Sequence, residues 1–254
     1  MTNVTHDQKR FLMTTTLTTP YIYYNKAQNL SPEAEQALAK ANEYFDKQDI
    51  EHVSEYYKKA LDASPKSPEL MSNVGAMLSA QGVASEAVKI LKQAIETDPK
   101  CVGALYNLAT LFLSGSAIKL AHEFFEKAVA LDPKSPAVLN NLGITYLHMS
   151  DYPKAQECFH KALEANEGFD YALHNLGTTY YDQNNFEEAM NWFHKSLAIN
   201  AQNFASLNDL GCALYLQGKT DEAITFFKKS IEANKQNRMP FYNLGYVGFT
   251  QNLI

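Results

Sequence analysis

The chain has few cysteines, no cluster of basic residues and no long apolar run. Its 254 residues include 22 Lys and Arg against 28 Asp and Glu, so the formal net charge is -6. No run of Lys or Arg is longer than a pair. A nucleic-acid surface needs clustered cations to neutralise phosphates, so nucleic acid is not expected as a partner. No apolar stretch approaches the roughly 18 residues that cross a bilayer, and no membrane span is expected.

The three cysteines are Cys101, Cys158 and Cys212. They are odd in number and far apart, which does not match a disulfide framework. We therefore expect a reducing, cytoplasmic environment, with Cys158 as a buried packing residue.

Motifs for catalysis and metal binding are also missing. The sequence has no glycine-rich phosphate loop, no serine in a nucleophile elbow and no Cys or His pair at metal-ligand spacing. Cys158 and His160 stand two residues apart, so on a helix they point to different sides. We expect no catalytic residue, no metal and no cofactor, and hence a protein that is not an enzyme.

Residues 1–30 differ from the rest of the chain. Lys9 and Arg10 precede a short mixed stretch that three threonines interrupt and that ends at Pro20. A secretory signal needs a cleaner apolar core and a small-residue cleavage site. We predict a flexible Thr-rich segment over 1–30 and a folded domain over 31–254.

A single period organises that domain. Pro65, Pro99 and Pro133 stand 34 residues apart. Taking each proline as position 32 places repeat starts at Ala34, Pro68, Val102, Pro136, Asp170 and Phe204, with a partial seventh at Arg238. The eighth position is then always small, from Ala41 to Gly245, and the twenty-fourth is aromatic or large, from Tyr57 to Phe227.

The repeated columns fit a pair of helices. Positions 4, 7, 8 and 11 share one face of a first helix, and positions 20, 24 and 27 share one face of a second. Small residues at positions 8 and 20 allow a close approach, which the aromatic residue at position 24 fills. Turn residues lie between the two helices, as Gly82, Gly115, Asn184–Asn185 and Gly218 illustrate.

This pattern resembles the tetratricopeptide repeat family, whose unit is a 34-residue helix–turn–helix. The resemblance implies an all-α, right-handed superhelical solenoid of about six and a half stacked antiparallel helix pairs. Glu167, Ala201 and Lys235 replace the proline in repeats four to six. Stacking between neighbours supplies most of the stability in such folds, so we expect the fold to tolerate these departures.

The resemblance also implies a concave groove on the side of the first helix that faces away from the core. Asparagine recurs there at position 6, with one aspartate: Asn73, Asn107, Asn141, Asn175, Asp209 and Asn243. An amide both donates and accepts, so a column of amides can hold the backbone of an extended chain. A similar ladder occurs in the repeat region of O-GlcNAc transferases. The alternative is that these amides bond neighbouring helices.

The composition of the first helices supports a binding face. Positions 2 to 13 of repeats two to seven hold only three charged residues, namely Glu69, Asp182 and Asp209. Aromatic residues and histidines are expected on the open face instead: Tyr106, His148, Tyr171, His174, Tyr242 and Tyr246. Amphipathic aromatic side chains are typical of binding surfaces. For the two histidines we expect polar lining, because no carboxylate or cysteine completes a metal site.

The scarcity of charged residues on the first helices also disfavours one kind of protein partner. Repeat domains that bind the acidic tails of heat-shock chaperones use basic residues together with asparagines. Asn42 and Asn73 match that pattern, but Leu38, Gly103 and Asn107 stand where cations are required.

The seventh repeat offers Phe241, Leu244, Phe249 and Leu253 without a second helix to cover them. The chain is then a fragment of a longer protein, or this helix packs against another chain or against residues 1–30. We favour an interaction scaffold or adaptor that binds an extended polypeptide. A substrate-recruiting arm of a glycosyltransferase and a self-associating structural protein are the alternatives.

Overall fold

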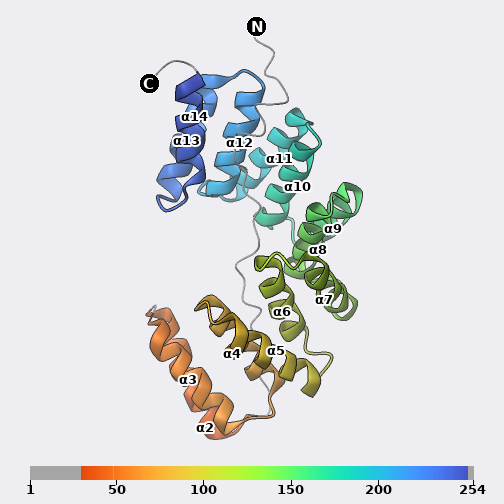
Figure 1. The fold of residues 1–254 in the computed structure, drawn as a ribbon, viewed down its shortest axis with the longest axis vertical. Coiled ribbons are helices and arrows are strands. Elements are labelled where there is room, and N and C mark those ends of the chain that lie inside the picture. The colour runs from red at the N-terminus through yellow and green to blue at the C-terminus, as the bar shows by residue number, and fades with distance from the viewer. Residues whose placement is uncertain (1–29, 48, 251–254) are drawn as a thin grey trace. The chain divides into compact units, whose positions relative to one another are not determined.

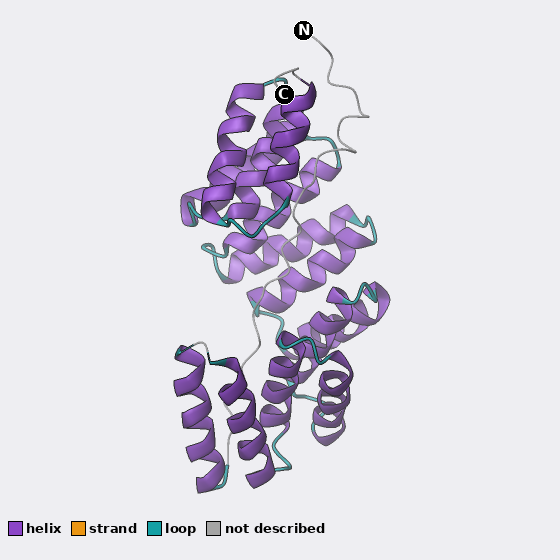
Figure 2. Cartoon of the chain, turned by 60° about the vertical axis from the view of Figure 1, so that its left-hand side comes forward, coloured by secondary structure: helices purple, strands orange, loops and turns teal. Residues whose placement is uncertain are grey.

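A computed structural model describes residues 30–47 and 49–250, and the expectations for residues 1–29 and for Leu253 lie outside it. The described residues form thirteen α-helices and no strand (Figure 1). Short loops join the helices (Figure 2). The predicted all-α solenoid fold is confirmed.

Two kinds of helix alternate along the chain. The first helices of the repeats, here called A helices, are α2 (Pro32–Asp46), α4 (Pro68–Ala80), α6 (Val102–Ser114), α8 (Pro136–His148), α10 (Asp170–Asp182), α12 (Phe204–Leu216) and α14 (Met239–Thr250). The second helices, here called B helices, are α3 (Ile50–Ala63), α5 (Ala84–Thr97), α7 (Ile118–Leu131), α9 (Tyr152–Ala165), α11 (Phe186–Ile199) and α13 (Thr220–Ala233). Each helix therefore falls within the repeat that the period assigns to it, except that α2 begins two residues before Ala34.

The chain divides into two compact units, with the boundary between Thr145 and Tyr146 inside α8. In the first unit, α2, α4 and α6 each pack against the B helix of their own repeat, and α4 also packs against α6. In the second unit, α10 and α12 pack against α11 and α13 in the same way, and α14 packs against α13 and α12. Both units are stacks of helical hairpins.

The contact between positions 8 and 24 sets how closely the two helices of a hairpin approach. A Cβ atom added to Gly211 would lie 2.6 Å from the ring of Phe227, and one added to Gly75 would lie 2.5 Å from Leu91 Cγ. Phe227 and Leu91 are completely buried. The predicted pairing of a small residue with a large one is therefore the central packing contact of the hairpin.

The turn between the helices depends on one left-handed residue, always at position 15. Its φ lies between 59° and 78° at Gly82, Ser116, Ser150, Asn184 and Gly218. Gly115, which the sequence suggested as a turn residue, has φ -82° instead. Gly115 lies in the turn as predicted, and Ser116 is the left-handed residue of this turn.

Polar contacts occur where repeat five lacks the proline. Asn200 follows the last residue of α11, and its Nδ2 donates to Asp170 Oδ2 at 2.9 Å. Asn203 Nδ2 donates to the same oxygen at 3.2 Å, while Asn203 Oδ1 accepts from the backbone N–H of Ser206 and caps α12. Side-chain hydrogen bonds therefore anchor this junction between α11 and α12.

Replacing Ser116 with glycine should stabilise the protein. A serine in the left-handed region costs roughly 1–2 kcal/mol, which exceeds the entropic cost of a glycine, so we expect a gain of about 0.5–1 kcal/mol in the free energy of unfolding. Chemical denaturation measures it. Ser114→Gly, two residues away at the helical end of α6, is the matched control and should not stabilise. Equal effects of the two changes would contradict the argument.

Candidate binding face

The A-helix face consists of the residues at positions 2, 5, 6, 9 and 13 of the A helices. All six predicted residues at position 6 are buried, with between 0% and 5% of their surface exposed. The sequence analysis placed these side chains on an open face, and for their exposure that expectation was wrong. Five of the six, from Asn107 to Asn243, contact a polar side chain of an adjoining residue or repeat.

In the first unit, hydrogen bonds connect residues 35 positions apart. Asn107 Nδ2 donates to Ser72 Oγ at 3.1 Å, and Asn141 Nδ2 donates to the Tyr106 hydroxyl at 3.0 Å. In each case the residue at position 6 bonds the residue at position 5 of the preceding repeat. Asn140 Nδ2 also donates to Asn141 Oδ1 at 3.1 Å, within one helix. The amides therefore hold successive A helices in register.

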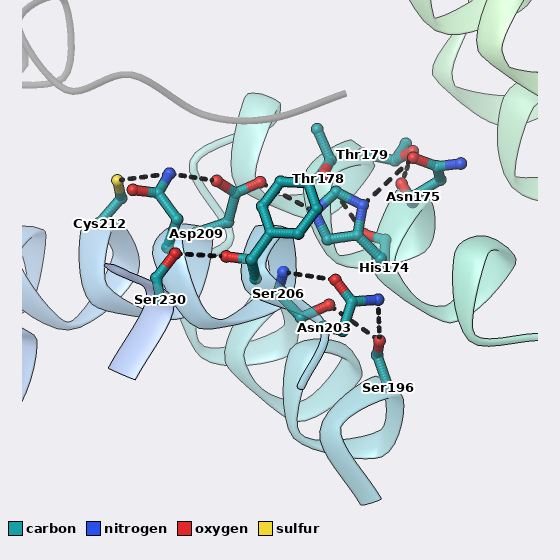
Figure 3. A network of polar contacts seen from close by, with 12 residues as sticks. His174, Asn175, Thr178, Thr179, Ser196, Asn203, Ser206, Asp209, Cys212 and Ser230 are labelled. Atoms are coloured by element: carbon teal, nitrogen blue, oxygen red, sulfur yellow. Dashed lines mark hydrogen bonds and ion pairs between the residues drawn. The ribbon is translucent and has the colours of Figure 1, made fainter. Parts of the chain in front are cut away.

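The second unit repeats this arrangement with different side chains. Asn243 Nδ2 donates to Asn208 Oδ1 at 2.9 Å, and Asn208 Nδ2 donates to Asp209 Oδ1 at 2.8 Å. Asp209 Oδ2 lies 3.0 Å from His174 Nε2, and Figure 3 shows the carboxylate directed at the imidazole. His174 Nδ1 lies 3.4 Å from Asn175 Oδ1. A continuous polar chain thus runs from α10 through α12 to α14.

The pair formed by His174 and Asp209 is completely buried. The sequence analysis treated His174 as exposed polar lining without a carboxylate partner, and the structure corrects both points. The ring of His174 also lies 5.6 Å from that of Phe193, centroid to centroid. No group of three or more His, Cys, Asp or Glu side chains that could hold a metal occurs among the described residues. The pair is therefore a contact between repeats.

The other predicted face residues differ in exposure. Tyr106 is buried and meets the ring of Phe125 edge-on, with centroids 5.7 Å apart. Tyr171 and Tyr246 are half-buried, and His148 and Tyr242 are exposed. The aromatic side chains that a partner could reach from solvent are thus those of α10 and α14.

Burial changes the acidity of several side chains. It raises the pKa of Tyr246, with a further contribution from Tyr215. Partial desolvation of the imidazole lowers the pKa of His148, although the residue as a whole is exposed. Burial also raises the pKa of the Cys158 thiol to about 11 and that of Cys212 well above its ordinary value. All three cysteines are buried thiols. Cys158 is therefore a packing residue, as the sequence predicted.

The sequence named Tyr106, His174 and Tyr242 at position 5 but gave no role to Ser72, Asn140 and Asn208 at the same position. These three residues are buried beside the predicted column and form hydrogen bonds with it. A signal was present, because polar side chains recur 35 residues apart across adjacent repeats. A comparison at the 34-residue period does not detect this signal. Each bond between repeats joins position 6 of one repeat to position 5 of the preceding repeat, which lies 35 residues earlier in the chain.

A pocket lies on the B-helix side of the first unit. It is lined by Lys58, Leu61, Asp62, Val74, Leu78, Glu86, Lys89, Ile90 and Gln93. Charged side chains of both signs surround its apolar floor. It therefore differs in chemistry from the A-helix face.

Comparison with known families agrees with this arrangement. Four models described as tetratricopeptide repeat match residues 37–67, 78–136, 135–202 and 204–237. The chain belongs to the tetratricopeptide repeat family.

Solved structures share the fold. A tetratricopeptide repeat protein from Parabacteroides merdae ATCC 43184 has a TM-score of 0.71 at 20% identity, over 87% of this chain and 88% of its own. PilF of Pseudomonas aeruginosa has a TM-score of 0.68 at 18% identity, over 84% and 97%. A chain of the APC/C hetero-tetramer Cut9-Hcn1 has a TM-score of 0.76 at 19% identity over 85% of this chain, which spans only 42% of that chain. A search of curated proteins found no match. At these identities the likeness shows the fold alone.

Within the described residues, none of the helices has the length and apolar character needed to cross a membrane.

Changing Asp209 tests the buried pair. Asp209→Ala removes the carboxylate from a completely buried imidazole, which should cost about 1–3 kcal/mol in the free energy of unfolding. Asp209→Asn restores the side chain found at position 6 of the other repeats, and its amide can present either a donor or an acceptor to His174. We expect less than half the loss from it. Urea unfolding at pH 7 compares the two, and equal losses would contradict the role of the pair.

Proposed function

We propose that this protein is an interaction scaffold that binds an extended, uncharged polypeptide segment along its A-helix face. The family assignment supports a protein-interaction scaffold in general. The finer proposal depends chiefly on one observation, the near absence of charge from the A helices of repeats two to seven. An acidic tail or a nucleic acid would require cations that this face does not provide.

The side chains along the face suit recognition of a peptide backbone. Amides, hydroxyls and an imidazole recur there in consecutive repeats, and their mutual hydrogen bonds fix their orientation. A pre-oriented polar group loses little entropy when it bonds a ligand. We therefore propose that the buried position-6 side chains hold the repeats in register and thereby fix the orientation of the accessible side chains that contact the bound segment.

The half-buried and exposed aromatic side chains would supply affinity. Tyr171 begins α10 beside Phe169, with ring centroids 5.6 Å apart, and Tyr246 of α14 lies against Tyr215. Such rings give a large contact area while losing few rotatable bonds. Among the solved structures, YrrB is titled a TPR protein with an unusual peptide-binding site, at 18% identity and a TM-score of 0.54.

No catalytic role is proposed. The three buried thiols favour a reducing compartment, and we propose a cytoplasmic location on that basis.

Selection of peptides tests the chemistry of the partner. A displayed library of random twelve-residue peptides is panned against the 254-residue chain. We expect the enriched peptides to have few Asp, Glu, Lys or Arg residues, because a charge buried on this face would lack a partner. Enrichment of acidic or basic peptides would overturn the proposal.

Substitutions on the face test where a selected peptide binds. The double variant Asn107→Ala, Asn141→Ala and the single variant Tyr171→Ala should each weaken binding at least about 10-fold, measured by calorimetry. Asn191→Ala changes an exposed asparagine on α11 and is the matched control. Circular dichroism checks that helicity is kept. Unchanged affinity in both face variants would show that the peptide binds elsewhere.

A further inference from the structure

The last described helix, α14, has an apolar stripe that no described residue covers. Phe241 is 49% exposed and Phe249 is 75% exposed, and Tyr242 and Gly245 lie exposed between them. The opposite side of α14 packs on the preceding repeat through buried Pro240, Asn243 and Val247. One side of α14 therefore packs on the preceding repeat, and the other side is exposed.

The same positions are covered in the other repeats. Position 4, which Phe241 occupies, holds buried residues in five repeats: Met71, Leu105, Leu139, Leu173 and Leu207. Position 12, which Phe249 occupies, holds buried Leu113, Leu147, Tyr181 and Tyr215. The exposure in α14 is therefore a property of its place in the stack, because these positions are otherwise interface positions.

Gly245, at position 8 of the seventh repeat, differs from the corresponding glycines of other repeats in the same way. A Cβ atom on Gly75 or Gly211 would collide with the large residue of the neighbouring B helix, whereas one on Gly245 would meet nothing within 4 Å. Gly245 is thus a notch of the kind that receives a large side chain in other repeats, and here no described residue enters it.

We propose that this stripe is a self-association surface on which α14 packs antiparallel against α14 of a second copy. This proposal does not rest on peptide binding to the A-helix face, although Tyr242 belongs to both surfaces. Symmetry supports it, because Phe241 and Phe249 stand four residues before and after Gly245. A two-fold axis at Gly245 reverses one helix against the other, so Phe249 of each copy lies opposite Phe241 of the other, and the two notches at Gly245 allow the helices to approach closely.

Charge and continuity favour the same occupant. Helix α14 has no Asp, Glu, Lys or Arg in its sequence, so two copies meet without repulsion between like charges. The contact would also continue the antiparallel packing that joins the helices inside each repeat. A second copy therefore covers the exposed aromatic side chains with its own.

The size of the surface sets the strength of the association. Phenylalanine and tyrosine side chains each bury about 150–250 Å², so the exposed parts of Phe241, Tyr242 and Phe249 amount to roughly 350 Å² in each copy. The total of about 700 Å² is below the roughly 1,200 Å² of a standard stable interface. We expect a reversible dimer with a dissociation constant of roughly 10–100 µM.

Sedimentation velocity of the 254-residue chain from roughly 1 to 300 µM tests this association. The wild type should shift from monomer to dimer over this range. Phe249→Gln should raise the dissociation constant at least about 10-fold. Gly245→Gln should do the same by filling the notch. A Cβ atom at this position meets nothing within 4 Å in the single chain, so we expect the fold to be kept.

Ile199→Gln is the matched control, since Ile199 is an exposed apolar residue at the end of helix α11. It should leave the dissociation constant unchanged. A wild type that stays monomeric throughout would overturn the proposal, as expected if a helix of another protein covers α14. Dimerisation that survives both Phe249→Gln and Gly245→Gln would overturn it as well, because another surface would then be responsible.

Discussion

The fold depends on how closely the two helices of a repeat can approach each other. Where a glycine stands at position 8, the large side chain at position 24 occupies the space that a Cβ atom would need. This contact is completely buried in four successive repeats, through Phe125, Phe159, Phe193 and Phe227. It makes the hairpin a rigid unit, and the polar residues of the A helix then emerge in the same orientation each time. Every feature of the A-helix face follows from that repetition.

Packing within a hairpin does not by itself align one hairpin with the next. Apolar contacts between repeats are tolerant of small shifts, whereas a hydrogen bond between buried side chains is not, because a lost partner leaves a polar group without compensation. Bonds such as those from Asn107 to Ser72 and from Asn243 to Asn208 therefore specify the register between repeats. Stability and alignment are thus supplied by different residues of the same helix.

The period of the sequence was enough to predict the fold and the repeat boundaries. Gly211 and Phe227 pack against each other within one repeat. Because other repeats make the same contact, the two positions recur along the sequence every 34 residues. The environment of the candidate face was harder to predict, because His174 and Asp209 meet across a repeat boundary and differ from their columns in residue type. A helical wheel of α10 alone places His174 on a polar face, and only the neighbouring helix shows that this face is buried. The left-handed Ser116 was missed for a similar reason, since its conformation comes from the shared turn and not from its residue type.

The hydrogen bonds between repeats also affect how the number of repeats in such a chain can change during evolution. An amide can donate to a hydroxyl, a phenol or another amide, as Asn107, Asn141 and Asn243 each do to a different partner. A repeat with asparagine at position 6 could therefore follow almost any other repeat, and whole units could be duplicated or lost without a mismatch. Asp209 is the exception, because a buried carboxylate needs the imidazole of His174 before it. Repeats five and six would have to be inherited together.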